Sequence, residues 1–311
     1  MARVRALESL VTATLAACGL ALVVAATNTG TVAAEEQAPG TMALGFVGSD
    51  TCLTCHTTQS LHGTPHGNDK IPGSPAAAQG CEACHGPGAK HVEDDAKGHI
   101  RKFARMEPRD VSETCVTCHN RTEHAMWDGS AHNARNLGCT TCHSVHSFKS
   151  STGQLVRAGQ MELCATCHKP QVQKQLRSSH MPVREGKMTC TTCHNPHGSI
   201  NVRQLRVGSY INEACVSCHA EKRGPFLWEH AAGRESCSTC HDPHGSNNDR
   251  MLVARQPSLC QRCHIGTRHP STIYDGTALA SRSNRLVLRG CTNCHQQIHG
   301  SNHPSGFSFA R

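Results

Sequence analysis

Hydrophobic positions along this chain show little of the regular spacing that marks long helices or strands. Helical periodicity is weak and brief, and it favours short helices only over residues 163–177 and 212–221. Proline and glycine interrupt most of the remaining sequence, and the alternation of apolar and polar residues that predicts strands is nearly absent. We therefore expect mostly short helices and irregular loops, with very little β-structure.

The only long apolar run lies near the N-terminus. Arg3 and Arg5 precede an almost uncharged segment, residues 10–26, and small residues at 32–34 precede Glu35, which is the pattern of a cleaved export signal. Lipidation at Cys18 and retention of the run as a membrane anchor are the two alternatives. We divide the chain into a signal peptide (residues 1–34), a linker rich in Gly and Ala (35–50) and one domain (51–311).

Cysteine and histidine form the strongest pattern in the sequence. CxxCH occurs ten times and uses twenty of the 21 cysteines. The motifs come in pairs, and the pairs recur roughly every 50 residues. They divide the domain into five repeats, approximately residues 51–114, 115–163, 164–214, 215–259 and 260–311.

CxxCH is the attachment signature of c-type haem. The two thiols bond to one porphyrin, and the histidine that follows them becomes an axial ligand of its iron. A zinc ribbon, a dithiol enzyme or a disulfide framework explains the pattern less well, because none of them requires a histidine after every cysteine pair. The sequence thus predicts a multihaem cytochrome c with ten covalently attached haem c groups.

The predicted attachment residues are Cys52, Cys55, Cys81, Cys84, Cys115, Cys118, Cys139, Cys142, Cys164, Cys167, Cys190, Cys193, Cys215, Cys218, Cys237, Cys240, Cys260, Cys263, Cys291 and Cys294. The histidines that complete these motifs, here called the proximal histidines, are His56, His85, His119, His143, His168, His194, His219, His241, His264 and His295.

Each repeat contains two further histidines that we expect to be second axial, or distal, ligands. They are His66, His91, His132, His146, His180, His197, His230, His244, His269 and His299. Spacing favours His66 over His62, and His91 is preferred to His99. His124 and His303 are not needed. Which distal histidine serves which iron stays open, because the partner could lie in the same repeat or in an adjacent one.

Composition indicates that the haems themselves form the core. Only 3% of the residues are aromatic, whereas a chain of this length normally buries a large apolar core. We therefore expect the protein to be largely unfolded without haem. Residues 35–311 provide too little protein to insulate ten rings from one another. Five repeats that contact chiefly their neighbours predict a linear ten-haem array.

The charge and the ligand set limit the function. The formal net charge is +8, but haem propionates provide partners for the excess Lys and Arg, so nucleic-acid binding is not expected. An iron with two histidine ligands has no position for a substrate, and histidine ligation gives lower potentials than methionine ligation. We expect an electron carrier and no enzyme. There are two alternatives: a multihaem oxidoreductase with one open haem, and a free-standing periplasmic carrier or store of electrons.

Several segments resemble a known family. They are CHNPHG (193–198), GPFLWEH (224–230), CHDPHG (240–245) and CTNCHQQIHGSNHPSG (291–306). In these the chain is similar to the decahaem periplasmic cytochromes of the MtrA, MtoA, PioA and DmsE group. Two positions depart from the pattern: His146 lies in CHSVHS, and a Gly-Pro-Gly turn displaces His91.

The resemblance implies a periplasmic cytochrome lodged in an outer-membrane β-barrel partner. Such a protein exchanges electrons between the periplasm and extracellular metal oxides, Fe(II) or sulfoxides. Its further partners would be an outer-surface multihaem cytochrome and periplasmic or inner-membrane cytochromes. The direction of electron flow is not specified by the sequence.

Overall fold

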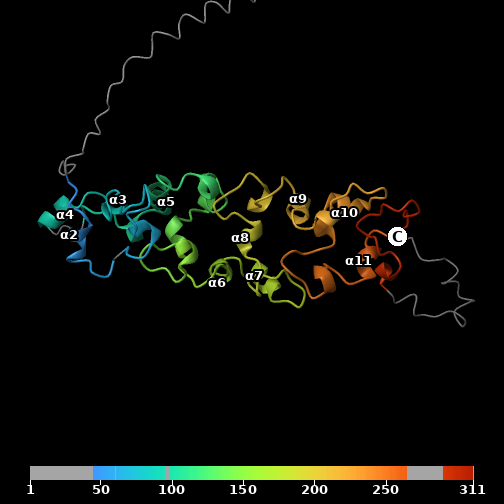
Figure 1. Cartoon of the computed structure of the whole chain (residues 1–311). Coiled ribbons are helices and arrows are strands. Elements are labelled where there is room, and N and C mark those ends of the chain that lie inside the picture. Colours follow the sequence, from blue (N-terminus) through green and yellow to red (C-terminus); the bar gives the residue numbers. More distant parts are fainter. Residues whose placement is uncertain (1–44, 60, 95–97, 265–289, 311) are drawn as a thin grey trace, which may run out of the picture. The chain divides into compact units, whose positions relative to one another are not determined.

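The computed structural model describes residues 45–59, 61–94, 98–264 and 290–310. The predicted signal peptide, Cys18 and His269 lie outside these residues. Contacts separate the chain into residues 1–44 and a second unit, residues 45–311, to which all described residues belong. Short helices, turns and loops make up this unit (Figure 1). Between its described residues β-structure is limited to isolated bridges. The predicted fold class is confirmed.

The first motif of each repeat lies at the C-terminal end of a short α-helix. These helices are α2 (Ser49–Leu53), α5 (Pro108–Val116), α6 (Gln160–Ala165), α9 (Ile211–Val216) and α11 (Ser258–Gln261). The helices stop at the motif because the proximal histidine leaves helical geometry, as in His168 (φ −93°, ψ 44°) and His219 (φ −101°, ψ 53°). The segments expected to be helical, 163–177 and 212–221, are therefore each divided in two. Their second parts are α7 (Lys169–Gln175) and the 3₁₀ turn η8 (Ala220–Lys222).

The second motif of each repeat occupies a single helical turn. These turns are α3 (Glu82–His85), η5 (Cys139–Thr141), α8 (Cys190–Cys193), η9 (Cys237–Thr239) and η13 (Cys291–Asn293). The remaining helical elements are α4 (Ala89–Asp94), α10 (Ala231–Glu235), η1 (Pro65–Gly67), η2 (Phe103–Arg105), η3 (Thr122–His124), η4 (Asn133–Arg135), η6 (Thr152–Gln154), η7 (Val202–Gln204) and η10 (Asp249–Met251).

After three of the second motifs the chain returns to pair with the motif histidine. The bridges join His143 to Leu155, His194 to Leu205 and His241 to Leu252. In two of these loops an asparagine amide fixes the return: Asn201 Nδ2 donates to Leu205 O at 2.9 Å, and Asn248 Nδ2 donates to Leu252 O at 2.8 Å. The loops thus have the same construction in successive repeats.

The Pro-His-Gly segments pack against the preceding repeat. Ser179 and Ser246 exchange two backbone hydrogen bonds, of 3.1 and 2.8 Å. Gly245, just before Ser246, has φ +119°, and a Cβ atom there would lie 2.3 Å from the carbonyl oxygen of Lys174. Only glycine tolerates both this conformation and this approach. The glycine of the motif therefore allows one repeat to dock on another.

Side chains contribute little apolar core to this unit. Five hydrophobic residues are buried among the described residues: Val111, Trp127, Leu155, Leu205 and Leu259. One buried carboxylate organises the first repeat, because Glu82 is only 3% exposed and accepts backbone N–H groups from Val47, Gly48 and Gly88 at 2.8–3.1 Å. Packing of this kind orders the loops locally but does not provide a single hydrophobic centre.

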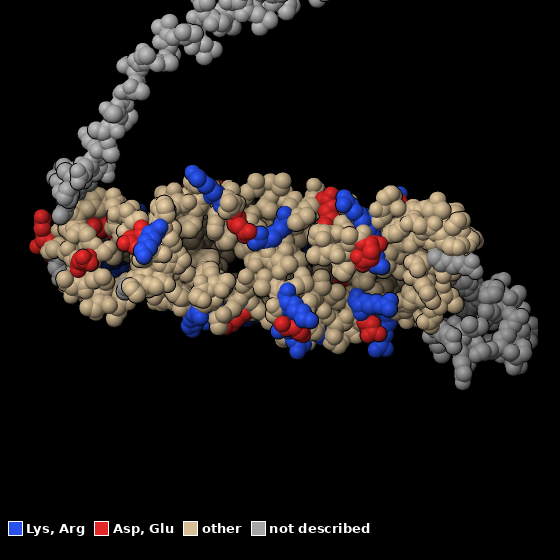
Figure 2. Space-filling view, viewed as in Figure 1, with Lys and Arg blue, Asp and Glu red and all other residues tan. Residues whose placement is uncertain are grey.

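The surface carries charges of both signs. On the face drawn in Figure 2, acidic and basic residues form small groups separated by wide uncharged areas. A search of the described helices found none with the length and apolar character that a membrane crossing requires.

Candidate haem sites

All ten CxxCH motifs have the same local geometry. In each, the backbone N–H of the proximal histidine donates to the carbonyl oxygen of the first cysteine, with N···O distances of 2.8–3.1 Å. This is the hydrogen bond of one α-helical turn. It brings two thiols and one imidazole to the same side of the backbone, as attachment to a single porphyrin requires. We number these motifs as sites 1 to 10 in chain order.

Eight proximal histidines lie opposite a second histidine. The distances between ring centres are 5.9–6.3 Å, and the pairs are His56–His91, His85–His146, His119–His66, His143–His197, His168–His132, His194–His244, His241–His299 and His264–His230. Each second member is one of the histidines expected from the sequence to be distal. His146 and His91, the two departures from the family pattern, are included.

The spacing of these rings fits an iron atom between them. An imidazole nitrogen lies about 2 Å from a first-row metal ion and about 1 Å from its own ring centre, so two axial imidazoles have centres about 6 Å apart. Three of the pairs have interplanar angles of 9°, 15° and 20°. The donor set, two imidazoles plus two thiols in the motif, is that of c-type haem.

Two of the expected distal histidines do not lie opposite a proximal histidine among the described residues. His269 lies outside the described residues. The ring of His180 makes none of these contacts with another histidine within the described chain. Instead its Nδ1 lies 2.6 Å from Arg177 O and its Nε2 lies 3.1 Å from Glu185 Oε1.

The histidines not expected to be ligands have other surroundings. His99 Nε2 lies 3.3 Å from Asp94 Oδ2. His303 Nδ1 accepts a hydrogen bond from the Ser305 backbone N–H at 3.2 Å. His124 was not expected near a site, yet its ring centre lies 4.1 Å from that of His197. Its position follows from the turn η3, which the sequence pattern did not reveal.

The proximal histidines of all second motifs share a partner type. Nδ1 of each contacts a backbone carbonyl oxygen in the loop that follows. The contacts are His85–Arg101, His143–Gly153, His194–Arg203, His241–Arg250 and His295–Ser308, and the first four have Nδ1–O distances of 2.6–2.9 Å. A donor Nδ1–H leaves Nε2 free for a metal and fixes the ring orientation. Sequence analysis missed these loops. The recurring Asn-x-x-x-Leu segments at 201–205 and 248–252 were the available signal.

Neighbouring motifs lie close enough for their thiols to influence one another's pKa values. Within the repeats, the first cysteines of the two motifs are close. A hydrogen bond with Cys139 raises the pKa of Cys115, and a hydrogen bond with Cys190 raises the pKa of Cys164. The pKa of Cys52 is raised first by burial and then by the nearby thiol of Cys81. In the last two repeats burial raises the pKa of the first cysteine to about 11, with the partner thiol adding to it, in the pairs Cys215–Cys237 and Cys260–Cys291.

Between repeats, the second cysteines of adjacent motifs are close. Burial raises the pKa of the first member of each pair and the thiol of the second member raises it further; the pairs are Cys84–Cys118, Cys142–Cys167, Cys193–Cys218 and Cys240–Cys263. The two kinds of contact alternate along the chain. Together they connect sites 1 to 10 in sequence order without a gap.

Three families of haem proteins match parts of the chain. The doubled CXXCH motif matches residues 180–224 and 230–269, the NrfB-like cytochrome c-type proteins match residues 81–167, and the cytochrome c554 and c-prime family matches residues 24–86. The matches cover most of the motif-bearing region. They support covalently bound haem c at its CxxCH motifs.

Individual relatives are multihaem cytochromes. The chain is 44% identical over 270 residues to the multihaem cytochrome MtrA of Shewanella baltica, which covers 83% of this chain and 80% of that protein. It is 27% identical over 129 residues to the cytochrome c-type protein NrfB of Escherichia coli (39% of this chain, 65% of that protein). It is 28% identical over 239 residues to the polyhaem cytochrome OmcB of Geobacter sulfurreducens (68% and 29%).

Motif geometry and similarity agree on the class of protein. The repeated attachment turns and the opposed imidazoles are those of a multihaem electron-transfer cytochrome. The extent and identity of the match to the Shewanella protein define the group more narrowly. The chain belongs to the MtrA family of multihaem cytochromes.

Proposed function

We propose that this protein is a decahaem electron-transfer cytochrome in which two histidines hold each iron. The observation that carries the proposal is the set of eight opposed histidine pairs with ring centres 5.9–6.3 Å apart. Each pair contains one proximal histidine. Hydrophobic packing alone does not explain why imidazoles face one another at this separation in every repeat.

The ligands follow one rule along the chain. Second-motif irons take the trailing histidine of the next repeat, as in His194–His244. First-motif irons take the leading histidine of the preceding repeat, as in His168–His132. Site 1 has no preceding repeat and takes His91 of its own repeat.

The same rule assigns His180 to the iron of His219, with the iron replacing Glu185 at Nε2. His269 does not follow the rule. It is the one expected distal histidine left, and we assign it to the remaining iron, that of His295 in its own repeat. All ten sites are then closed to substrate. Most ligand pairs join two repeats, and each of these pairs would also cross-link the fold.

When bound, each haem supplies a one-electron couple. The chain positions these couples by placing consecutive motifs close together, as the mutual influence of the thiols from Cys52–Cys81 to Cys260–Cys291 indicates. Because tunnelling falls steeply with distance, an electron would pass mainly between neighbouring sites. Sequence order then becomes the order of transfer in a quasi-one-dimensional array.

We further propose that the protein works in the periplasm, lodged in an outer-membrane β-barrel, and exchanges electrons with extracellular donors or acceptors. Its partners would include periplasmic or inner-membrane cytochromes and an outer-surface multihaem cytochrome. The export-signal pattern of residues 1–34 supports the compartment. The large apolar side chains of the described residues that are more than 60% exposed, namely Ile200, Leu227 and Phe307, support a protein partner that covers part of the surface.

Haem counting and electron paramagnetic resonance test the ligation. We expect ten haems per chain and only low-spin ferric signals in the purified protein. The matched measurement is a redox titration of the same sample, which should reduce all of the haem. The reduced haem should not bind added carbon monoxide. Far fewer haems, or high-spin signals from several irons, would contradict the proposal.

Fractionation and reconstitution test the location. Affinity purification from outer membranes should recover a barrel protein with the cytochrome. When a reductant is added outside lipid vesicles that contain the complex, its electrons should pass through the complex and reduce a dye enclosed inside them. The cytochrome without its partner is the control. Recovery of the cytochrome alone in the periplasmic fraction would favour a free-standing carrier or store.

A further inference from the structure

Two trailing histidines occupy matching turns that differ by one charge. His197 lies in CHNPHG and His244 lies in CHDPHG. In the first, Asn195 Oδ1 accepts the backbone N–H of His197 at 3.1 Å. In the second, Asp242 Oδ1 accepts the backbone N–H of His244 at 3.0 Å. The turn geometry is therefore the same, and a carboxylate replaces an amide.

The carboxylate of Asp242 also faces the imidazole. Its Oδ1 lies 3.6 Å from His244 Nδ1, and its Oδ2 lies 2.6 Å from the ammonium nitrogen of Lys174 in α7. The Asp242 side chain is 20% exposed, so solvent only partly screens it. With an ordinary pKa of about 3.9 for aspartate, the group is ionised at neutral pH.

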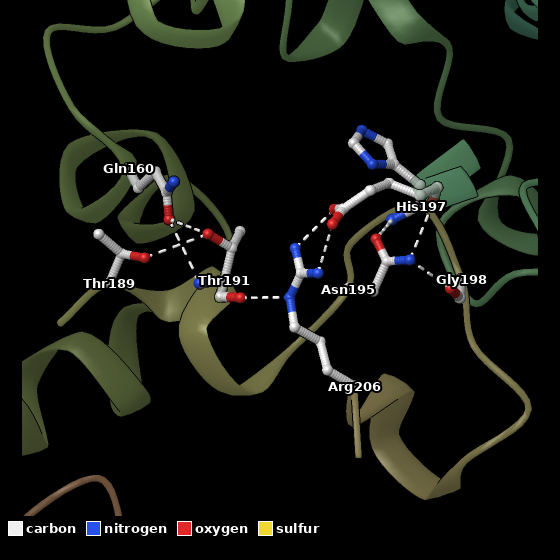
Figure 3. Close-up of polar contacts among 8 residues, drawn as sticks. Gln160, Thr189, Thr191, Asn195, His197, Gly198 and Arg206 are labelled. Atoms are coloured by element: carbon white, nitrogen blue, oxygen red, sulfur yellow. Dashed lines mark hydrogen bonds and ion pairs between the residues drawn. The ribbon is translucent and has the colours of Figure 1, made fainter. Parts of the chain in front are cut away.

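The turn that contains asparagine provides a comparison within the same molecule. The amide of Asn195 donates to Glu123 O at 2.9 Å and to Gly198 O at 2.7 Å, and the Nδ1 atom of His197 is buried without a hydrogen-bond partner. Both oxygens of the Glu123 carboxylate are held by Arg206, at 2.5 and 2.6 Å. Figure 3 shows Arg206 and the hydrogen bond from Asn195 to Gly198. The Glu123 carboxylate is close enough to act on the imidazole of His197, but it is paired with Arg206, and the turn residue Asn195 adds no charge.

A carboxylate beside the outer nitrogen of a metal-bound histidine raises the basicity of that ligand. A more basic imidazole and a nearby negative charge both stabilise the ferric state relative to the ferrous state, which carries one positive charge less. The potential of the iron therefore falls. A positive charge close to the carboxylate opposes this effect, as Lys174 does here.

We propose that Asp242 is a positioning residue that lowers the reduction potential of the iron between His194 and His244. The inference rests on the proposed ligation of site 6 by these two histidines, whose ring centres are 6.3 Å apart with an interplanar angle of 9°. Lys174 limits the size of the effect. Site 6 is then harder to reduce than it would be with an amide in place of the Asp242 carboxylate.

Three variants of the haem-loaded protein test this. Asp242→Asn keeps the acceptor for the His244 backbone and removes the charge, so one tenth of the haem should become easier to reduce. We expect the ferrous-to-ferric ratio at that site to rise about tenfold at a fixed potential, a shift of about 59 mV for a one-electron couple. Lys174→Gln leaves the carboxylate uncompensated and should shift one tenth of the haem in the opposite direction. Asp249→Asn removes the same charge from an exposed residue of the same repeat and should shift none.

The readouts are an optical redox titration and the low-spin paramagnetic resonance spectrum of each variant. Opposite shifts for Asp242→Asn and Lys174→Gln support the inference, and the Lys174 variant alone suffices if the other does not accumulate. Unchanged titrations with intact low-spin spectra would overturn the role of Asp242 and leave the proposed function standing. A high-spin signal in the unsubstituted protein would instead overturn the ligation.

Discussion

At the residue scale, the imidazoles of this chain differ in what holds their outer nitrogen. Second-motif proximal histidines such as His194 contact a loop carbonyl, whereas the buried Nδ1 atoms of His66 and His197 have no hydrogen-bond partner in the described chain. The hydrogen-bonded rings have one tautomer fixed by the backbone. Orientation of the others depends on packing and, in the proposed complex, on the iron itself.

The pairing of His66 with His119 gives a direct test of a distal ligand. Replacing His66 by alanine should convert one of ten irons to high spin, because His119 would lose the ring that lies 5.9 Å from its own. His62→Ala is the matched control, since this exposed histidine lies four residues away and should leave every iron low-spin. Paramagnetic resonance of the two ferric proteins distinguishes them. High spin in the His62 variant only would show that the ligand is His62.

Elements in this protein are too short to be stable alone, so contacts between repeats hold them in place. The longest described helix, α5, has nine residues, which is below the length at which isolated helices form in water. Pairs of backbone hydrogen bonds between Ser179 and Ser246, and between Trp228 and Ser301, tie two of the segments that end in His-Gly to the preceding repeat.

The docking glycine of the fourth repeat can be tested by stability. Gly245→Ala places a Cβ atom against the backbone of Lys174 and forces a residue with a side chain to adopt φ +119°. We expect a loss of about 1–3 kcal/mol, seen as a lower thermal midpoint of the haem-loaded protein. Gly98→Ala is the control, because this glycine has open space around its Cβ position and should change stability by no more than about 0.5 kcal/mol. Equal midpoints for both variants would contradict the docking role.

An ion pair between η3 and the chain after η7 should make a small, pH-dependent contribution. A hydrogen bond from Arg206 lowers the pKa of Glu123 in the folded protein. A carboxyl group with a lowered folded pKa stabilises the fold above its unfolded pKa, and this gain is lost as pH falls through the folded value. Because the Glu123 side chain is 48% exposed, Glu123→Gln should cost less than about 1 kcal/mol at pH 7.

The difference from the unsubstituted protein should disappear in acid. Thermal midpoints measured from pH 7 down to pH 3 would show this. A difference that persists at the lowest pH would mean that the glutamine disturbs packing and that the charge is not responsible.

The sequence predicted the local parts of the sites and left the long-range parts open. A CxxCH motif is contained in one turn, so its cysteines and histidine could be identified directly, and seven-residue spacing singled out His132 as a candidate. The ring that lies opposite His132 is that of His168, in the next repeat, and no local pattern indicates that pairing. The loop carbonyls that contact Nδ1 are backbone atoms, which carry no sequence signature of their own.

At the scale of the whole molecule, the described residues lack a core that side chains could form by themselves. Their five buried hydrophobic residues are spread over four of the five repeats: Val111 lies in the first, Trp127 and Leu155 in the second, Leu205 in the third and Leu259 in the fourth. Burial on this scale cannot offset the conformational entropy of ordering such a long, glycine-rich chain. Under the proposed ligation, covalent attachment and iron bonds between repeats supply most of the folding free energy.

Removing haem attachment should consequently remove the fold. A variant that lacks residues 1–34 would stay in the cytoplasm, away from the machinery that attaches haem, and should yield a chain without haem. We expect its circular dichroism to show little helix and its amide hydrogens to exchange within seconds, because no element has a stable partner. The exported protein of the same sequence is the control and should retain slow amides near the motifs. A haem-free chain with a cooperative thermal transition would mean that side-chain packing between the repeats is enough to form the fold, and that the haems are not needed for it.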